Sequence, residues 1–184
     1  MELSIDMNKR YSFEDIVKGV FGDTLVELYD GIVKLMSAPL DIHAKISMNV
    51  SVFFANLTNR TSGKCQIRHA PYAVRFSEDI VVHPDVCVIC DKNKIDKYGC
   101  VGAPDLIVEI LSPSTANRDW RYKYDLYEKH GVREYWIIDP ANNNVTVFIL
   151  KDGKYDHATV YEEGDVPVFI FDNELISLAD MFTD

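Results

Sequence analysis

The sequence predicts an α/β fold of mixed α+β type, in which a β-sheet carries helices on its faces. Residues 106–111 form a run of large aliphatic side chains with the length and β-branched content of a strand buried on both faces. The pair Asp30-Gly31 separates two apolar runs and predicts a hairpin. An apolar stripe with helical spacing follows Pro39 and predicts a long helix, with Ile42, Ile46, Val50, Phe53 and Leu57 on its buried face. Helices and strands are therefore interspersed, which favours a mixed sheet with helices packed on it.

Caps, turns and periodicity locate the other elements. Helices are expected at 13–20 with Ser12 as N-cap, at 39–63, at 116–130 with Gly131 as the stop, and as a turn near the C-terminus. Strands are expected at 25–29, 32–36, 65–69, 72–76, 84–90, 106–111, 134–139, 145–150, 155–161 and 168–171. The polar segment 91–102 is expected to be a loop.

The chain as a whole is expected to form one domain, 1–184, because this length suffices for a hydrophobic core. Its 47% hydrophobic and 26% charged content is that of an ordinary globular protein, and no apolar run is long enough to span a membrane. The first residues carry no export signal, so a cytoplasmic protein is expected. Its four cysteines are then expected to be reduced: Cys65, Cys87, Cys90 and Cys100.

The net charge of −10 constrains the partners. Proteins that bind a nucleic-acid backbone usually present a basic face. A nuclease function would therefore need a cleft that is basic locally. An acidic balance also suits small-molecule or protein partners.

Three residues have contexts that suggest chemistry. Glu109 lies inside the strand predicted to be buried, where an ionised carboxylate is costly unless a cation or hydrogen-bond donors meet it. Asp85 begins a second apolar strand, and two carboxylates on neighbouring strands can hold a hard divalent cation such as Mg²⁺. Lys123, on the helix that follows, is placed to orient or activate an attacking water.

These residues belong to a longer pattern. It comprises His83-Pro84-Asp85-Val86, the segment 99–115 around Glu109, then Asp119, Lys123 and Leu126-Tyr127, and finally Gly131-Val132-Arg133-Glu134-Tyr135-Trp136-Ile137-Ile138-Asp139-Pro140. The pattern resembles that of the Uma-two family of proposed endonucleases, and the resemblance covers nearly the whole chain. It implies a PD-(D/E)XK restriction-endonuclease-like core, a mixed β-sheet flanked by helices. It also implies a divalent-metal-dependent endonuclease that hydrolyses DNA phosphodiester bonds.

The resemblance also implies roles for individual residues. Asp85 and Glu109 would bind the metal, Mg²⁺ or Mn²⁺. The lysine expected two residues after the glutamate is absent, because Leu111 stands there, and Lys123 is the matching residue on the next helix. Glu27 and His43 match the family more loosely and would complete the pocket. The predicted catalytic residues are Asp85, Glu109, Lys123, Glu27 and His43.

Each of these residues also has a simpler structural explanation. Asp85 could cap a turn, and Glu109 could pair with Lys123 or an arginine without any metal. Lys123 could be solvated or paired with Asp119, four residues earlier. Glu27 would ordinarily be a surface residue beside a hairpin turn. His43 would ordinarily be packed or solvated on its helix.

Other functions stay open on the sequence alone. The charge and the missing lysine favour a catalytically inactive nuclease-fold module for binding or interaction, as a homodimeric scaffold. A weaker alternative is hydrolysis of a small phosphorylated molecule. A zinc site at Cys87-x-x-Cys90 is disfavoured, because residues three apart on a strand point to opposite faces. Several aromatic residues suit either base stacking or the core: Tyr122, Tyr124, Tyr127, Tyr135 and Trp136.

Overall fold

The computed structural model describes residues 5–61, 63–113 and 116–183. The strands of the larger sheet are β3 (Gln66–His69), β6 (Val86–Ile89), β8 (Leu106–Ile110), β9 (Glu134–Asp139), β10 (Asn144–Lys151), β11 (Lys154–Tyr155) and β12 (Thr159–Tyr161). Their order is β11-β10-β9-β8-β6-β3, with β12 also paired to β10. β8 and β9 run parallel, and the other neighbours run antiparallel, so this sheet is mixed as predicted.

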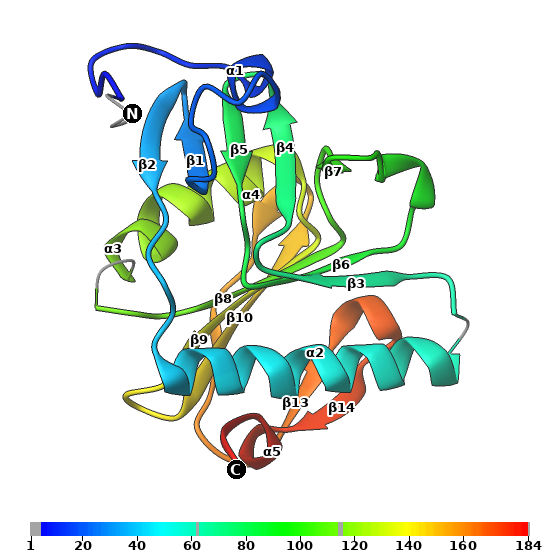
Figure 1. Ribbon diagram of the computed structural model, residues 1–184. Helices are drawn as coiled ribbons and strands as arrows, with labels where there is room; N and C mark the ends of the chain where they lie inside the picture. Colours follow the sequence, from blue (N-terminus) through cyan, green and yellow to red (C-terminus); the bar gives the residue numbers. More distant parts are fainter. Residues whose placement is uncertain (1–4, 62, 114–115, 184) are drawn as a thin grey trace.

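A smaller sheet packs beside the larger one (Figure 1). Its strands are β1 (Val26–Tyr29), β2 (Ile32–Leu35), β4 (Ala73–Ser77), β5 (Ile80–Val82) and β7 (Gly99–Val101). They are ordered β2-β1-β5-β4-β7. The β1-β2 hairpin turns at Asp30 and Gly31, whose φ angles of 50° and 79° lie in the left-handed region that such turns require.

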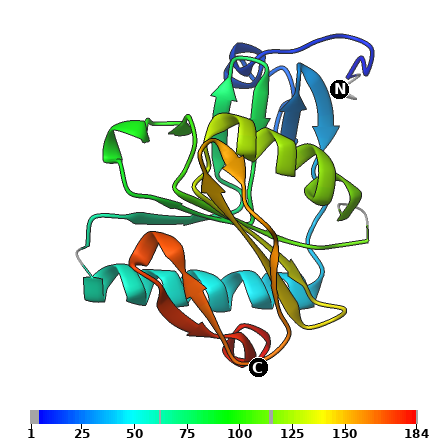
Figure 2. The same cartoon turned by 180° about the vertical axis from the view of Figure 1, so that it is seen from behind.

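Helices cover both faces of the larger sheet (Figures 1 and 2). The helical segments are α1 (Phe13–Val17), α2 (Asp41–Thr61), η1 (Lys92–Lys94), α3 (Ala116–Arg118), η2 (Asp119–Lys123), α4 (Tyr124–His130), η3 (Phe169–Phe171) and α5 (Leu178–Phe182). One core cluster joins α2, α5 and the pair β13 (Asp165–Val168) and β14 (Glu174–Ser177) to one face of the sheet. A second cluster joins α4 to the opposite face.

The alternation of side chains along β8 sets the orientation of Glu109. Leu106, Val108 and Ile110 enter the core cluster that contains α2. Ile107 enters the cluster that contains α4. Because successive strand residues point to opposite faces, Glu109 lies on the α4 side with Ile107. All five residues of β8 are buried, so the prediction of a strand buried on both faces is confirmed.

Several segments differ from the sequence prediction. The expected strand 168–171 is the end of β13 followed by the helical turn η3. The segment 91–102 is not simply a loop, because it contains η1 and also β7, which pairs in parallel with β4. β5 is likewise not predicted, since it is only three residues long: it forms a short hairpin with β4, and its pairing with β1 is non-local. The predicted helix 116–130 is interrupted by η2, a π-helical turn. The predicted helix at 13–20 ends already at Val17.

The long helix α2 uses a slightly different apolar face from the one expected. Ile46, Val50 and Leu57 are buried as predicted. Phe54 is the fully buried phenylalanine, whereas Phe53, which was predicted on the buried face, is only partly buried. Ile42 is 41% exposed, so its assignment to the buried stripe is wrong. The first turn of α2 borders a cavity, described below, instead of the core.

The cysteines differ from the expectation of four reduced thiols. Cys65 and Cys90 form a disulfide, because β3 and β6 are antiparallel neighbours whose register places these two residues opposite one another. Cys87 and Cys100 are free and buried. Cys87 lies in the α4-side cluster, whereas Cys90 packs against the α2-side cluster. The two side chains therefore point to opposite faces of the sheet, as expected, and are not placed to bind one zinc ion together.

Among the residues that the structure describes, no helix has the length and apolar character needed to cross a membrane.

The predicted strand 134–139 is confirmed with the same bounds as β9. Tyr127, Tyr135 and Trp136 are fully buried, so these three aromatics belong to the core and are not surfaces for stacking on bases.

Candidate active site

A cavity of about 610 Å³ opens where the smaller sheet, the start of α2 and the segment after β8 meet. All five predicted site residues line it: Glu27, His43, Asp85, Glu109 and Lys123. They come from β1, α2, the start of β6, β8 and η2. Residues far apart in the sequence are thus brought to one concave surface by the pairing of strands and the return of the helix.

The register between β6 and β8 places Asp85 beside Glu109. The two strands are antiparallel and pair Val86 with Val108, so the next position along pairs Asp85 with Glu109. The carboxylate of Asp85 is fixed by the backbone N–H of Ile110, which donates to its Oδ2 at 2.7 Å. Both carboxylates line the same cavity. This is the arrangement that neighbouring strands can offer to a divalent cation.

Glu109 is 3% exposed and is held from the helical side. The Nζ atom of Lys123 lies 2.8 Å from Glu109 Oε1, and the hydroxyl of Tyr127 donates to the same oxygen at 2.6 Å. Both donors come from the segment packed on the α4 face, to which the alternation of β8 directs Glu109. The buried ion pair considered as an alternative for Glu109 is therefore present.

Lys123 is itself 4% exposed and is surrounded by acidic groups. Besides Glu109, its Nζ atom lies 3.5 Å from Asp119 Oδ1 and 3.8 Å from Glu27 Oε1. The expectation of a solvated Lys123 is wrong. The alternative pairing with Asp119 is present, but the contact with Glu109 is shorter.

The π-helical turn η2 brings Asp119 and Lys123 to the same buried side. Both residues are buried, whereas Trp120 and Arg121 between them are exposed. A π-helical turn contains one residue more than a regular helical turn, and such turns occur often at functional sites. The local geometry therefore presents both polar side chains to the cavity.

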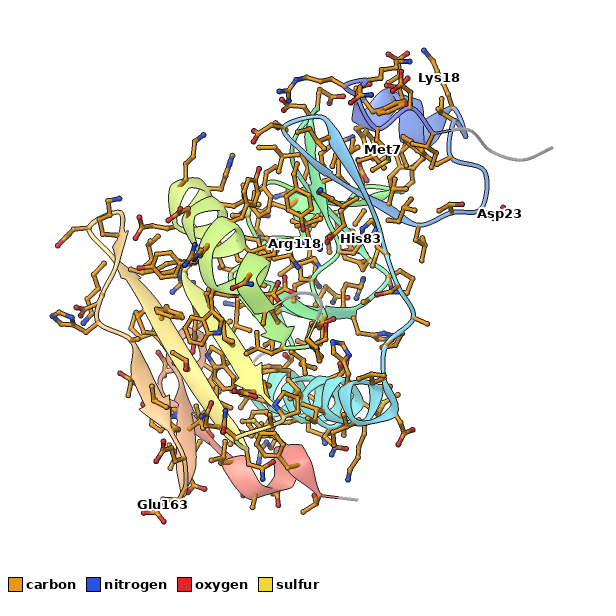
Figure 3. All side chains as sticks on the ribbon, turned by 90° about the vertical axis from the view of Figure 1, so that its left-hand side faces the viewer. Met7, Lys18, Asp23, His83, Arg118 and Glu163 are labelled. Atoms are coloured by element: carbon orange, nitrogen blue, oxygen red, sulfur yellow. A yellow bond between two sulfur atoms is a disulfide. The ribbon has the colours of Figure 1, made fainter. Side chains whose placement is uncertain are left out.

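Glu27 is buried at 4% exposure and lines the cavity, so the alternative of an ordinary surface residue beside the hairpin turn is wrong. Its Oε2 accepts hydrogen bonds from the Tyr29 hydroxyl at 2.7 Å and from the Arg118 Nη1 at 3.1 Å. Its Oε1 accepts from the backbone N–H of His83 at 3.0 Å. Figure 3 labels Arg118 and His83 near the centre of the molecule, where both meet this carboxylate.

His43 is paired with a site carboxylate and is not simply solvated. Its Nε2 atom lies 3.1 Å from Asp85 Oδ2. Burial alone would lower the pKa of His43, but the hydrogen bond and the charge of Asp85 raise it above its usual value. His43 therefore supports the position of Asp85 from the first turn of α2.

The buried carboxylates have pKa values shifted in opposite directions. Burial raises the pKa of Glu109 well above its usual value, although the charge of Lys123 opposes this shift. Burial would also raise the pKa of Glu27, but Lys123 and the His83 N–H reverse the effect and lower it. Burial would lower the pKa of Lys123, but Glu109 and the other acidic neighbours raise it well above its usual value. Lys123 therefore stays charged.

The site carries more negative than positive charge. Four carboxylates (Glu27, Asp85, Glu109 and Asp119) meet two cations (Arg118 and Lys123), so full ionisation gives an excess of two negative charges. Among the described residues, no group of three or more His, Cys, Asp or Glu side chains is arranged to hold a metal ion. Mg²⁺ is commonly bound through only one or two carboxylates together with water and substrate phosphate. The oxygen donors and the charge of Asp85 and Glu109 therefore fit such an ion.

Several site residues are not predicted from the sequence. Arg118 binds Glu27, Tyr127 binds Glu109, and His83 lines the cavity. Arg118 carries no local motif, and Tyr127 belongs to the family-like pattern without a predicted role. Only the fold brings these two residues to their partners. His83 precedes Asp85 within the recognised His-Pro-Asp run, so its position next to a candidate ligand is the one signal that could have identified it.

Comparison with known proteins adds a second kind of observation. The family Uma2, described as "Putative restriction endonuclease", matches residues 15–171. The chain belongs to the Uma2 family. That match includes all five predicted site residues, and families of this restriction-endonuclease-like kind usually use divalent metal ions.

Two individual proteins resemble this Uma2 member. The uncharacterized protein slr1290 from Synechocystis is 27% identical over 128 residues, which are 68% of this chain and 66% of that protein. The chain therefore spans slightly less than two thirds of that relative. A crystal structure described as "a putative nuclease belonging to DUF820" from Anabaena variabilis has a TM-score of 0.76 at 21% identity, covering 93% of this chain and 97% of the other. The second likeness supports a nuclease fold for this Uma2 protein.

Proposed function

We propose that this Uma2 protein is a divalent-metal-dependent endonuclease that hydrolyses DNA phosphodiester bonds. The observation that carries the proposal is that Asp85 and Glu109 line one cavity, with Lys123 Nζ 2.8 Å from Glu109 Oε1. A carboxylate pair beside a buried lysine is suited to phosphodiester hydrolysis, and the family match supports that assignment.

We assign the residues as follows. Asp85 and Glu109 hold Mg²⁺ or Mn²⁺, which when bound would stabilise negative charge on the phosphate and lower the pKa of water. Lys123 keeps Glu109 in place and orients the attacking water. His43 positions Asp85, and Glu27 fixes Lys123 and Arg118 through its own contacts. Arg118, half-buried at the cavity, is the cation placed to meet a substrate phosphate.

Cleavage assays on matched variants test this proposal. We expect Asp85→Asn and Glu109→Gln to lose cleavage of DNA in Mg²⁺ or Mn²⁺ by about a hundredfold or more, because each removes one ligand charge. Glu134→Gln is the control. Glu134 is a buried carboxylate outside the site whose Oε1 accepts from Trp136 Nε1 at 2.8 Å and whose Oε2 accepts from the Ile170 N–H at 2.9 Å. Glutamine keeps only one acceptor oxygen, so this variant controls for the loss of stability that neutralising a buried carboxylate causes. Activity that survives in both site variants would contradict the proposal.

A non-catalytic binding module is the second candidate function. Two observations favour it: the net charge of −10 and Leu111 in place of the expected lysine. In that function the buried contacts of Glu109 and Lys123 would serve only the fold, and a homodimer would act as a scaffold. This second function would be supported if the protein binds a partner without metal and cleaves none of the substrates offered.

We propose the cytoplasm as the compartment. In a reducing cytoplasm, reductants that reach the Cys65–Cys90 disulfide would reduce it to two thiols. Alkylation in intact cells would then modify these two cysteines, whereas a bridge that persists in cells would oppose this compartment.

A further inference from the structure

The cavity that holds the carboxylates has a second wall of different chemistry. That wall comes from the end of β2, the linker after it and the start of α2. Its apolar members are Leu35, Met36, Pro39, Leu40, Ala44 and Met48. Leu40, Ala44 and Met48 are spaced by four residues, and the N–H of Ala44 donates to the carbonyl of Leu40 at 3.0 Å, so these three lie along one helical face.

The second wall is open to solvent. Leu35, Leu40 and Met48 are 56%, 60% and 58% exposed, although each borders a cavity that also contains four carboxylates. Exposed large apolar side chains that gather at a concave site mark a surface that gains from contact with a ligand. The wall therefore favours a substrate with one apolar, flat part beside its phosphate.

The cations of the cavity are too few for duplex DNA. Among the described lining residues the only lysine and arginine are Lys123 and Arg118, and both are paired with carboxylates. Proteins that grip duplex DNA neutralise several successive phosphates with separate cations. This cavity offers positive charge for about one phosphate.

The size of the cavity leads to the same substrate class. A volume of about 610 Å³ lies within the range of sites that enclose one small ligand. A single nucleotide is such a ligand. A base that is paired and stacked in a duplex cannot turn its face onto a protein wall, whereas an unpaired base can.

We propose that the substrate is a nucleic acid whose nucleotide at the scissile phosphate is unpaired, as in a single strand, and that its base packs on Leu40 and Met48. This inference rests on the proposed nuclease function and specifies the substrate class of the same site. Base and phosphate would then be recognised by different parts of the lining, the phosphate by Arg118 and by the divalent ion that Asp85 and Glu109 would hold.

Three substrates of equal length test the proposal in Mn²⁺. They are single-stranded oligothymidylate, the same strand paired with oligoadenylate, and a single strand of tetrahydrofuran abasic units. We expect cleavage of the single strand to exceed that of the duplex and of the abasic strand by about tenfold in kcat/KM, the effect of one well-packed base.

Variants of the wall complete the test. Met48→Ala and Leu40→Ala should each raise KM for oligothymidylate by about fivefold to tenfold with kcat little changed, and should leave cleavage of the abasic strand unaltered. The control is Val52→Ala, since Val52 is 51% exposed on the same helix but does not line the cavity. A wall variant that weakens cleavage of oligothymidylate but not of the abasic strand shows that the wall and the base interact, because a merely structural defect would slow cleavage of both strands.

Each other outcome overturns a defined claim. Equal cleavage of duplex and single strand would overturn this inference and leave the nuclease function standing. Cleavage of none of the three substrates would overturn the nuclease function and this inference with it. A change from dimer to monomer in sedimentation, caused by Met48→Ala or Leu40→Ala, would show that a second copy covers the wall. That result would overturn the base-binding assignment.

Discussion

At the scale of single residues, Lys123 is the centre of the site. It is buried and its Nζ atom contacts carboxylates from three elements: Glu27 on β1, Glu109 on β8 and Asp119 on η2. Carboxylates at these distances repel one another in a medium of low dielectric constant, and the ammonium group compensates that repulsion. Lys123 therefore joins the two sheets and the helical segment electrostatically.

Replacing Lys123 with methionine should destabilise the protein in a pH-dependent way. We expect the free energy of unfolding to fall by about 3–5 kcal/mol at about pH 8, because buried carboxylates are left without a cation. Their pKa values in the folded protein would then lie above those of the unfolded chain, so the folded state binds more protons. Stability lost at about pH 8 should therefore return in part at about pH 5, measured by urea unfolding.

The control for this variant is Lys154→Met. Lys154 pairs with Glu128 at 2.7 Å, but its side chain is 80% exposed. An exposed pair of this kind contributes little to stability, because solvent screens it. A loss in Lys123→Met that is the same at both pH values would show that the lysine stem, and not its charge, stabilises the site.

The sequence predicts the site residues better than it predicts their surroundings. Asp85 and Glu109 stand in buried strands, where a carboxylate needs an explanation, and the register of β6 and β8 brings them together. Lys123 could be selected only by resemblance to the family, because a helical lysine is by itself unremarkable. The partners Arg118 and Tyr127 could not be predicted, since their contacts depend on how the helical segment packs on the sheet.

At the scale of elements, the π-helical turn η2 decides which side chains of the 116–130 segment face the cavity. Periodicity predicts one regular helix there, because the apolar positions of α4 continue with helical spacing. A single additional residue in a helical turn leaves no clear signal in one sequence. The sequence therefore predicts the helix but not the phase shift within it.

Deleting Arg121 should remove this phase shift. Arg121 is exposed, and its loss should convert η2 to a regular helical turn, which rotates 116–120 by about 100° relative to α4. Arg118 and Asp119 would then leave the cavity, while Tyr127 would stay against Glu109. We expect cleavage to fall by about tenfold or more while the cooperative unfolding transition persists.

The matched control is Arg121→Ala, which keeps the chain length. It should retain cleavage close to that of the wild type, since Arg121 does not line the cavity. Equal losses in the deletion and the alanine variant would indicate that the side chain matters and that the helical phase does not.

At the scale of the whole molecule, the net charge of −10 and the fold place different limits on function. The fold was predictable in outline, because the buried strand, the hairpin and the long helix each carry a local pattern. The short strands β5 and β7 were not, because each has only three residues and the pairings of β5 with β1 and of β7 with β4 are non-local. The cavity is lined by segments far apart in the sequence, among them β1, the start of α2 and the end of β8, so its volume could not be foreseen.

The charge leads to a prediction about salt. A protein that neutralises many phosphates loses affinity steeply with salt, with a logarithmic slope of about −6 to −10. With only Arg118 and Lys123 lining the described cavity, we expect a slope of about −1 to −2 for the KM-derived affinity toward a single strand. A series of cleavage assays in increasing KCl measures it. A slope near −6 would reveal a basic surface elsewhere on the protein.

The most direct test of the central claim is titration calorimetry of Mn²⁺ into the wild type, Asp85→Asn, Glu109→Gln and Glu134→Gln. The site geometry predicts binding at about 1 mM or tighter in the wild type and in Glu134→Gln, weakened tenfold or more in the other two. Metal binding of equal strength in all four proteins, or in none of them, would contradict a divalent-metal site at Asp85 and Glu109.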